Sequence, residues 1–278
     1  MIKIFDLHND LLTGCDNYLS QLKKYKSSNN KIILAFFRGN KNIDETINNL
    51  NFIKKILPKN CYLSFEDIGY DNQNKIQDLL NFKPIYFSLT WNGENNLAYG
   101  CNFPNEDIKP EGINIINMAN KRKIALDTAH ISRKGFYTII DKADFVLCSH
   151  TALNSVYSHK RNVTDDQIRL IIEKGGIIGL CLYNEFISES ESNVEKLVKH
   201  IDYFVNKFGY KNLSFGTDFF GAKDFIKNVN NYQNFSKIVD YLIKIGYNIK
   251  VINYILYFNA KKYVDNIKFL QNSLNNIH

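Results

Sequence analysis

Side chains that can bind metal ions recur at the ends of short apolar segments throughout this chain. The segments lie far apart in the sequence, and each is long enough for one strand of a sheet. The side chains are those of His8, Asp10, Glu66, His130, His150 and Asp218. A closed barrel of parallel strands explains this recurrence, because the carboxyl ends of its strands converge on the face where such enzymes carry out chemistry. The pattern therefore predicts a metal-dependent hydrolase built on a barrel.

Eight apolar runs are expected to form strands, which is the number that a closed barrel of this kind requires. The runs cover residues 2–6, 31–37, 61–65, 84–90, 123–127, 145–149, 176–182 and 213–217. The chain has 278 residues, of which 45% are hydrophobic, and such barrels commonly form one domain of roughly 250 residues. We therefore expect an α/β protein with a (β/α)8 TIM-type barrel, as a single domain over residues 1–278.

The segments between the expected strands have helical patterns. Three of them begin with a residue pair that is typical of a capping box. The pairs are Asn42 with Glu45, Thr164 with Gln167, and Ser192 with Glu195. The helix that begins at Ser192 is expected to end at Gly209, a usual position for a left-handed cap. After the last strand, residues 234–245 and 248–267 are expected to form two extra helices that brace the barrel.

Charge and cysteine content narrow the class of protein. The net charge is +7, but the lysines are dispersed, which favours a solvated surface over a patch that binds nucleic acid. The five cysteines are odd in number and are expected to be reduced. No apolar run approaches the ~20 residues that span a bilayer, and the first apolar residues lead directly into a polar segment. We expect a soluble, cytoplasmic protein with no membrane partner.

Taken alone, each candidate ligand is weak evidence, because a histidine at a strand end is often only hydrogen-bonded and a glutamate can cap a helix or form a salt bridge. His8 and Asp10 are two residues apart, so on an extended strand both side chains leave the same face and can bind one ion. Glu66 follows an apolar strand, where an unpaired charge is costly, so it needs a cation or several donors. His130 and His150 follow consecutive strands and together form a nitrogen pair that suits zinc.

These residues resemble the membrane (renal) dipeptidase family, which are binuclear zinc peptidases of the amidohydrolase superfamily. The resemblance extends over nearly the whole chain, and the segment from Asp127 to Gly179 is its most specific part. The other matching segments are DLHNDLL, the glutamate of SFED, FSLTWNGENNLAYG, PEGINIINMANKRK and NLSFGTDFFG, followed by a helix that carries Asn259. The fold implied by the family is the barrel that the strand count also predicts.

The resemblance implies a role for each candidate residue. His8 and Asp10 would bind one zinc ion, Glu66 would bridge two, and His130 and His150 would bind the second. Two further residues complete the implied site. Arg161 would receive the terminal carboxylate of the substrate, which suits its planar fork of donors, and Asp218 would hydrogen-bond the metal-bound water and pass its proton to the leaving amine.

Three positions differ from the family pattern. Glu66 is followed by Asp67 rather than by glycine, which concerns the shape of that loop. Trp91 occupies the position of a histidine that contacts the scissile carbonyl in mammalian members, so this role is altered or falls to Asn92 or Asn95. We therefore include Trp91 and Asn92 among the expected substrate-binding residues. Phe220 precedes a glycine where other members have aspartate, so a carboxylate beside the site is absent.

The resulting functional prediction is a zinc-dependent dipeptidase that uses a metal-bridging hydroxide. Its substrates would be dipeptides, including dipeptides with a D-residue at the carboxyl end. Two alternatives remain: a superfamily hydrolase that acts on a different amide or a lactone, and a non-catalytic relative. A small peptide is the expected partner, other divalent metals are alternatives to zinc, nucleic acid is not expected, and a homodimer is an alternative to a monomer.

Overall fold

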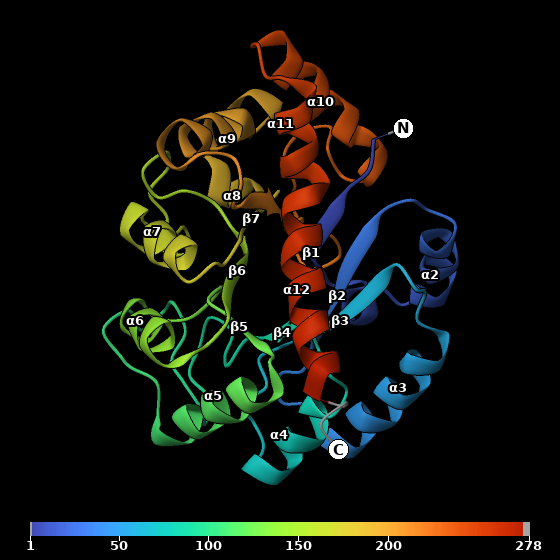
Figure 1. Cartoon of the computed structure of the whole chain (residues 1–278), viewed down its shortest axis with the longest axis vertical. Helices are drawn as coiled ribbons and strands as arrows, with labels where there is room; N and C mark the ends of the chain where they lie inside the picture. The colour runs from blue at the N-terminus through green and yellow to red at the C-terminus, as the bar shows by residue number, and fades with distance from the viewer. Residues whose placement is uncertain (1, 275–278) are drawn as a thin grey trace.

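A closed barrel of eight parallel strands forms the centre of the computed structural model, which describes residues 2–274 (Figure 1). The strands are β1 (Phe5–Asn9), β2 (Lys31–Phe37), β3 (Cys61–Glu66), β4 (Tyr86–Phe87), β5 (Ala125–Asp127), β6 (Val146–Thr151), β7 (Ile178–Leu180) and β8 (Leu213–Phe215). They pair in sequence order, and the pairing of Asp6 in β1 with Phe215 in β8 closes the ring. The expected (β/α)8 fold is confirmed.

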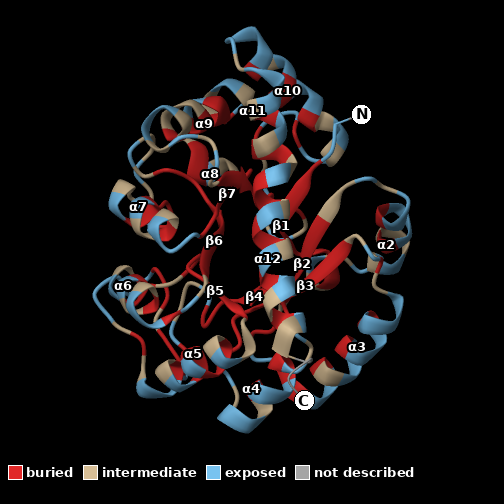
Figure 2. Cartoon of the chain, in the orientation of Figure 1, coloured by how far each residue is buried: buried red, intermediate tan, exposed pale blue. Residues whose placement is uncertain are grey.

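Helices surround the strands, and in Figure 1 α12 crosses in front of them. The helices are α1 (Leu11–Gly14), α2 (Tyr18–Lys26), α3 (Ile43–Ile56), α4 (Gln73–Leu80), α5 (Pro110–Arg122), α6 (Arg133–Lys142), α7 (Asp165–Glu173), α8 (Asn184–Ile187), α9 (Val194–Phe208), α10 (Phe235–Lys244), α11 (Ile249–Asn253) and α12 (Asn259–Ser273). The strands are almost entirely buried, whereas the helices bury one face and expose the other (Figure 2). None of the helices in residues 2–274 is long and apolar enough to cross a membrane.

The amino-terminal end of the barrel is covered by α12. Tyr263 and Ile267 of this helix are buried in one apolar cluster with Phe5 and Tyr86 from the strands. The Tyr263 hydroxyl donates a hydrogen bond of 2.9 Å to the carbonyl of Val146, at the start of β6. Because this end is filled, the carboxyl end is the face at which a ligand can approach the barrel.

Two of the three expected helix starts are confirmed and one is wrong. The Thr164 capping box is present at the start of α7, and Asn42 accepts hydrogen bonds from backbone N–H groups at the start of α3. At α9 the cap is Asn193 rather than Ser192, because the Asn193 side chain accepts from the N–H of Lys196 at 3.0 Å. Ser192 is buried, and its hydroxyl hydrogen-bonds the hydroxyl of Ser188 instead.

The α9 helix ends where the sequence predicted. Gly209 has a φ of 78° immediately after the last helical residue, a backbone conformation that glycine adopts without steric cost. The two terminal helices form as expected, but the second is interrupted. A π-helical segment, Tyr254–Phe258, separates α11 from α12, and α12 continues to Ser273.

Two expected strands differ most from the observed ones. We expected β1 at residues 2–6, whereas it runs from Phe5 to Asn9 and includes His8, and the polar side chains of His8 and Asn9 are buried and hydrogen-bonded there. We expected β4 at residues 84–90, whereas it has only two residues. After Phe87, side chains form some of the hydrogen bonds that a longer strand would make with its neighbours. The Ser88 hydroxyl accepts from the Asp67 N–H, and the Asn95 side chain donates to the Leu89 carbonyl.

Candidate active site

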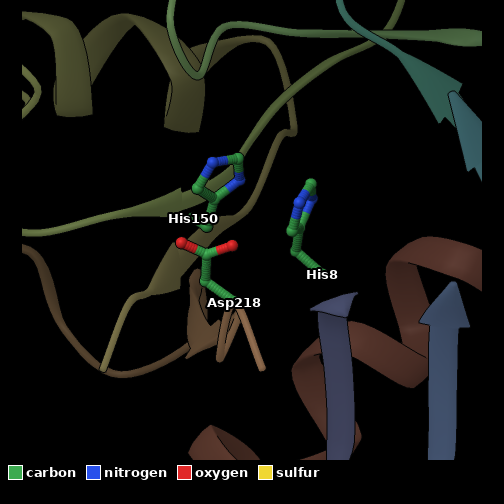
Figure 3. Close-up of side chains that lie close together, drawn as sticks. All are labelled: His8, His150 and Asp218. Carbon is green, nitrogen blue, oxygen red and sulfur yellow. The ribbon is translucent and has the colours of Figure 1, made fainter. Parts of the chain in front are cut away.

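Six side chains predicted from the sequence converge at the carboxyl end of the barrel. His8 and His150 lie within β1 and β6, Glu66 is the last residue of β3, and Asp10 follows β1. His130 and Asp218 each lie three residues beyond a strand, β5 and β8 respectively. Figure 3 shows the imidazoles of His8 and His150 and the carboxylate of Asp218 directed toward one another.

The Glu66 carboxylate lies between two groups of potential ligands. One of its oxygens, Oε2, lies 3.4 Å from Nε2 of His8, and that nitrogen lies 3.1 Å from Oδ2 of Asp10. The other oxygen, Oε1, lies 3.0 Å from Nε2 of His130, which lies 2.8 Å from Nε2 of His150. Each oxygen therefore faces a different pair of donor groups, which is the arrangement that a bridging carboxylate needs.

Burial and neighbouring side chains together shift the pKa values of this cluster. Burial, together with the nearby Arg161, lowers the pKa of His130 to about 4. Burial and the neighbouring His8 and His130 hold the pKa of His150 well below its usual value. Burial alone would raise the pKa of Glu66, but His130 and His8 more than offset it and lower that pKa. Near neutral pH, His130 and His150 are therefore neutral nitrogen donors beside an ionised carboxylate.

The hydrogen bonds of the cluster leave room for cations. His8 Nε2 and Asp10 Oδ2 are both buried, and apart from their contacts within the cluster they have no hydrogen-bond partner in the described residues. Nδ1 of His130 faces the oxygen Oδ1 of Asn92 at 2.8 Å, so this nitrogen carries the proton and Nε2 carries a lone pair. Buried polar atoms without hydrogen-bond partners destabilise the fold unless a ligand satisfies them. Imidazole nitrogens and carboxylate oxygens are zinc ligands, so the residues present fit such an ion.

Two of the six residues have a backbone conformation that only their surroundings can maintain. The φ angles of His130 and Asp218 are 67° and 61°, in the left-handed region that favours glycine. Such strain is concentrated at functional sites. The sharp turns after β5 and β8 direct both side chains back toward the barrel axis. A Cβ atom at Gly221 would lie 2.4 Å from oxygens of Asp10 and Asp218, so glycine is needed beside this pair.

A cavity of about 740 Å³ opens over the cluster. Arg161 lines this cavity and is only 6% exposed. One guanidinium nitrogen, Nη2, donates to the carbonyl of His150 at 3.2 Å, and the group lies 5.3 Å from the centre of the Phe186 ring. Its Nε has no hydrogen-bond partner, and no carboxylate of residues 2–274 forms an ion pair with it. A buried cation therefore faces the cavity without a counter-charge.

The loop after β4 supplies two residues of the cavity wall. Trp91 is 46% exposed, and its ring centre lies 6.0 Å from those of Phe37 and His130. Asn92 also lines the cavity, but its oxygen is engaged with His130. Asn95, the other candidate for the role of the absent histidine, is buried and donates to Asp67 and to the Leu89 carbonyl. Its amide therefore supports the loop and does not line the cavity.

The unusual residue after Glu66 is explained by its backbone. Asp67 has a φ of 57°, so it adopts the conformation that a glycine would take there. Its carboxylate accepts hydrogen bonds from the Trp91 N–H at 3.2 Å and from Asn95 at 2.9 Å. The substitution therefore keeps the turn and adds a link between the loops after β3 and β4.

Three residues near the cluster were not identified from the sequence. Tyr86, Asp127 and Ser149 are buried within strands and hydrogen-bond to ligand candidates or to one another. In the sequence, each is a polar residue within an apolar run, and many buried residues without a functional role have the same pattern. Asp127 ends an expected strand and begins the segment that most resembles the family, but no role was predicted for it.

A protein-family model matches most of the chain. Residues 71–278 match the model of the family described as "Membrane dipeptidase (Peptidase family M19)". A relative from Klebsiella pneumoniae, an uncharacterized protein in the pqqA 5' region, is 27% identical over 64% of this chain and 70% of its own length. An uncharacterized dipeptidase of Schizosaccharomyces pombe is 26% identical over 58% of this chain, but only 40% of its own length is covered.

A solved structure shares the fold over nearly the whole chain. It is a metallopeptidase from Rhodobacter sphaeroides, liganded with a phosphinate mimic of the dipeptide L-Ala-D-Ala, with a TM-score of 0.79 and 16% identity over 95% of this chain and 99% of the other. A closed barrel with this cluster at its carboxyl face is the architecture of a metal-dependent hydrolase. The chain belongs to the membrane dipeptidase family, and the expected enzyme class, a metal-dependent dipeptidase, is confirmed at the level of the family.

The family match begins after three of the six candidate ligands. His8, Asp10 and Glu66 lie outside residues 71–278, so the comparison does not support them directly. Their case depends on the geometry, in which His8 and Glu66 come within reach of the two histidines of the matched region.

Proposed function

We propose that this protein is a zinc-dependent dipeptidase whose site holds two ions. The observation that carries the proposal is the position of Glu66 between two donor pairs, next to a buried arginine that has no counter-charge. His8 and Asp10 would hold one ion and His130 and His150 the other, with Glu66 shared. When bound, the ions supply a water of lowered pKa and polarise the carbonyl of the substrate.

Arg161 would select the substrate by its carboxyl end. Its free edge faces a cavity that otherwise contains the cluster, and a guanidinium pairs best with a planar carboxylate. A longer peptide would place another residue where the carboxylate belongs. This supports dipeptides as substrates. The relative that binds a mimic of L-Ala-D-Ala supports the acceptance of a D-residue at the carboxyl end.

Asp218 would move the proton during hydrolysis. Its carboxylate lies among His8 and His150 but is not needed to complete either donor pair. Burial and the nearby charge of Asp10 raise its pKa well above the usual value. A group of this kind can accept a proton from the attacking water and deliver it to the leaving amine.

The test combines metal analysis with a substrate panel. Purified protein should contain two zinc ions per chain and hydrolyse dipeptides with a free carboxyl end, in both L,L and L,D forms. The same dipeptides with an amidated carboxyl end should be poor substrates. Hydrolysis of amidated dipeptides or lactones at equal rates would instead identify a superfamily hydrolase of different specificity, and activity with one ion or none would contradict the two-ion site.

A further inference from the structure

All three histidines of the cluster present Nε2 to its centre, and each has its other ring nitrogen, Nδ1, held by a different side chain. For His130 this is the amide oxygen of Asn92. For His8 and His150 the shorter contact is with a hydroxyl group, from Tyr86 and Ser149 respectively, and the Ser149 oxygen also lies 3.3 Å from Nδ1 of His8. A hydroxyl can either donate or accept, so it fixes the position of the ring proton only if its own proton is committed elsewhere.

The proton of Tyr86 is committed to the backbone. Its hydroxyl donates to the carbonyl of Leu7 at 2.7 Å, and a carbonyl can only accept. Toward Nδ1 of His8, at 2.9 Å, the same oxygen must therefore act as an acceptor. The neutral ring of His8 therefore carries its proton on Nδ1 and directs the lone pair of Nε2 toward Asp10 and Glu66.

The proton of Ser149 is committed to a buried carboxylate. Its hydroxyl donates to Oδ2 of Asp127 at 2.5 Å, so it accepts from Nδ1 of His150 at 2.7 Å. The orientation of Asp127 is itself fixed. Its other oxygen, Oδ1, accepts from the backbone N–H groups of Ala129 at 3.0 Å and Ser149 at 2.9 Å.

We propose that Tyr86 and the Ser149–Asp127 pair are positioning residues that hold His8 and His150 in the tautomer able to bind a metal ion through Nε2. This inference rests on the proposed two-ion site. Groups that orient metal-binding histidines in this way are typically worth 10- to 100-fold in metal affinity. The hydroxyl groups themselves are remote from the substrate cavity and do not line it.

The fixed orientation of Asp127 makes one substitution decisive. In Asp127→Asn the amide oxygen must stay at the two backbone N–H groups, so the amide NH2 faces the Ser149 hydroxyl. The hydroxyl then accepts from the amide and turns its own proton toward Nδ1 of His150. This stabilises the tautomer with a proton on Nε2, which cannot bind an ion. Ser149→Ala removes the hydroxyl and leaves the ring free to adopt either tautomer.

The experiment measures zinc binding to metal-free protein by competition with a chromophoric chelator. Tyr86→Phe and Ser149→Ala should each weaken one zinc site by about 10- to 100-fold. Asp127→Asn should weaken it more than Ser149→Ala does, although its side chain is nearly unchanged in size. The matched controls are Tyr263→Phe, which loses a buried hydroxyl bonded to the Val146 carbonyl, and Ser214→Ala, which loses a buried hydroxyl that has no partner in residues 2–274. Both controls should bind zinc like the wild type.

A second measurement does not depend on any variant. In the zinc-loaded protein, long-range 15N–1H correlation spectra of labelled histidine should show Nδ1–H and zinc-bound Nε2 for His8 and His150. Coordination through Nδ1 would overturn the proposal, as would zinc affinities for all three variants within twofold of the controls. If Asp127→Asn weakens zinc binding less than Ser149→Ala does, Asp127 is not a positioning residue. If zinc binds as described but dipeptides are not cleaved, the proposed function fails and the positioning roles stand. If the wild type binds no zinc, both fail.

Discussion

Removing the guanidinium of Arg161 should separate substrate recognition from metal binding. The group is 6% exposed, so little solvent screens its contact with a bound carboxylate. Its Nη2 donates to the carbonyl of His150, and the guanidinium forms no ion pair with a carboxylate in residues 2–274, so its charge is available to a substrate. Losing one partner of a buried, charge-assisted pair costs about 2–4 kcal/mol. This corresponds to a fall of about 30- to 900-fold in kcat/KM for a dipeptide.

The assay compares one dipeptide with its carboxyl-amidated form. The wild type should strongly prefer the free acid, mainly through KM, whereas Arg161→Ala should cleave both forms slowly and at similar rates. Arg161→Lys restores the charge without the fork and should recover only part of the preference. Arg169→Ala, which removes an arginine exposed on α7, is the control and should behave like the wild type. An unchanged preference in Arg161→Ala, with zinc content intact, would refute the carboxylate-binding role.

Three other residues give shorter tests. Glu66→Gln should lower the zinc content of both sites together, because each carboxylate oxygen faces a different donor pair; full occupancy by elemental analysis would contradict the bridging role. Asp218→Asn should retain both ions while kcat falls by ~100-fold or more, and loss of zinc would make Asp218 a ligand instead. His200 is buried with its pKa lowered by burial to about 4, so the unfolded chain binds the extra proton first and stability falls as the pH drops from about 6.5 toward 4. Unfolding of metal-free protein at pH 7 and pH 4.5 should therefore show a loss in the wild type that exceeds the loss in His200→Gln by on the order of 2–3 kcal/mol; equal losses would show that His200 does not titrate on unfolding.

The fold was predictable because its signals are local. An apolar run of strand length, a Thr164–Gln167 capping box and a glycine at position 209 each act within a few residues. Boundaries failed where distant side chains decide them. The first strand extends through His8 because Tyr86, on another strand, satisfies a polar ring that the local sequence marks as the end of the run.

The candidate ligands were predictable because metal-binding residue types coincide with the expected strand ends. The backbone turns and hydrogen bonds that hold these ligands in place were not predictable. His130 and Asp218 have left-handed backbone conformations, which the sequence does not predict because neither residue is a glycine. The bond between Ser149 and Asp127 joins residues 22 positions apart in adjacent strands. Before the register of those strands is known, nothing distinguishes this serine from a small buried filler. The roles of Asn95 and Trp91 in the loop after β4 were also not predictable. Only the folded loop shows that Asn95 is buried and that Trp91 is exposed.

The pairing of β1 with β8 gives the ring a seam between the first and last strands. There the backbone N–H of Thr217 donates a hydrogen bond of 2.8 Å to the Asp6 carboxylate, 211 positions earlier in the chain. Joining such distant segments costs on the order of 5 kcal/mol of loop-closure entropy. The first donor pair lies beside this seam, with His8 in β1 and Asp10 directly after it, and the bridging candidate Glu66 ends β3. An ion held by these three residues would bind only when the barrel is closed. With free ion at 100 times its dissociation constant, such an ion would stabilise the closed barrel by about 2.7 kcal/mol, so the ions that serve the chemistry would also stabilise the fold.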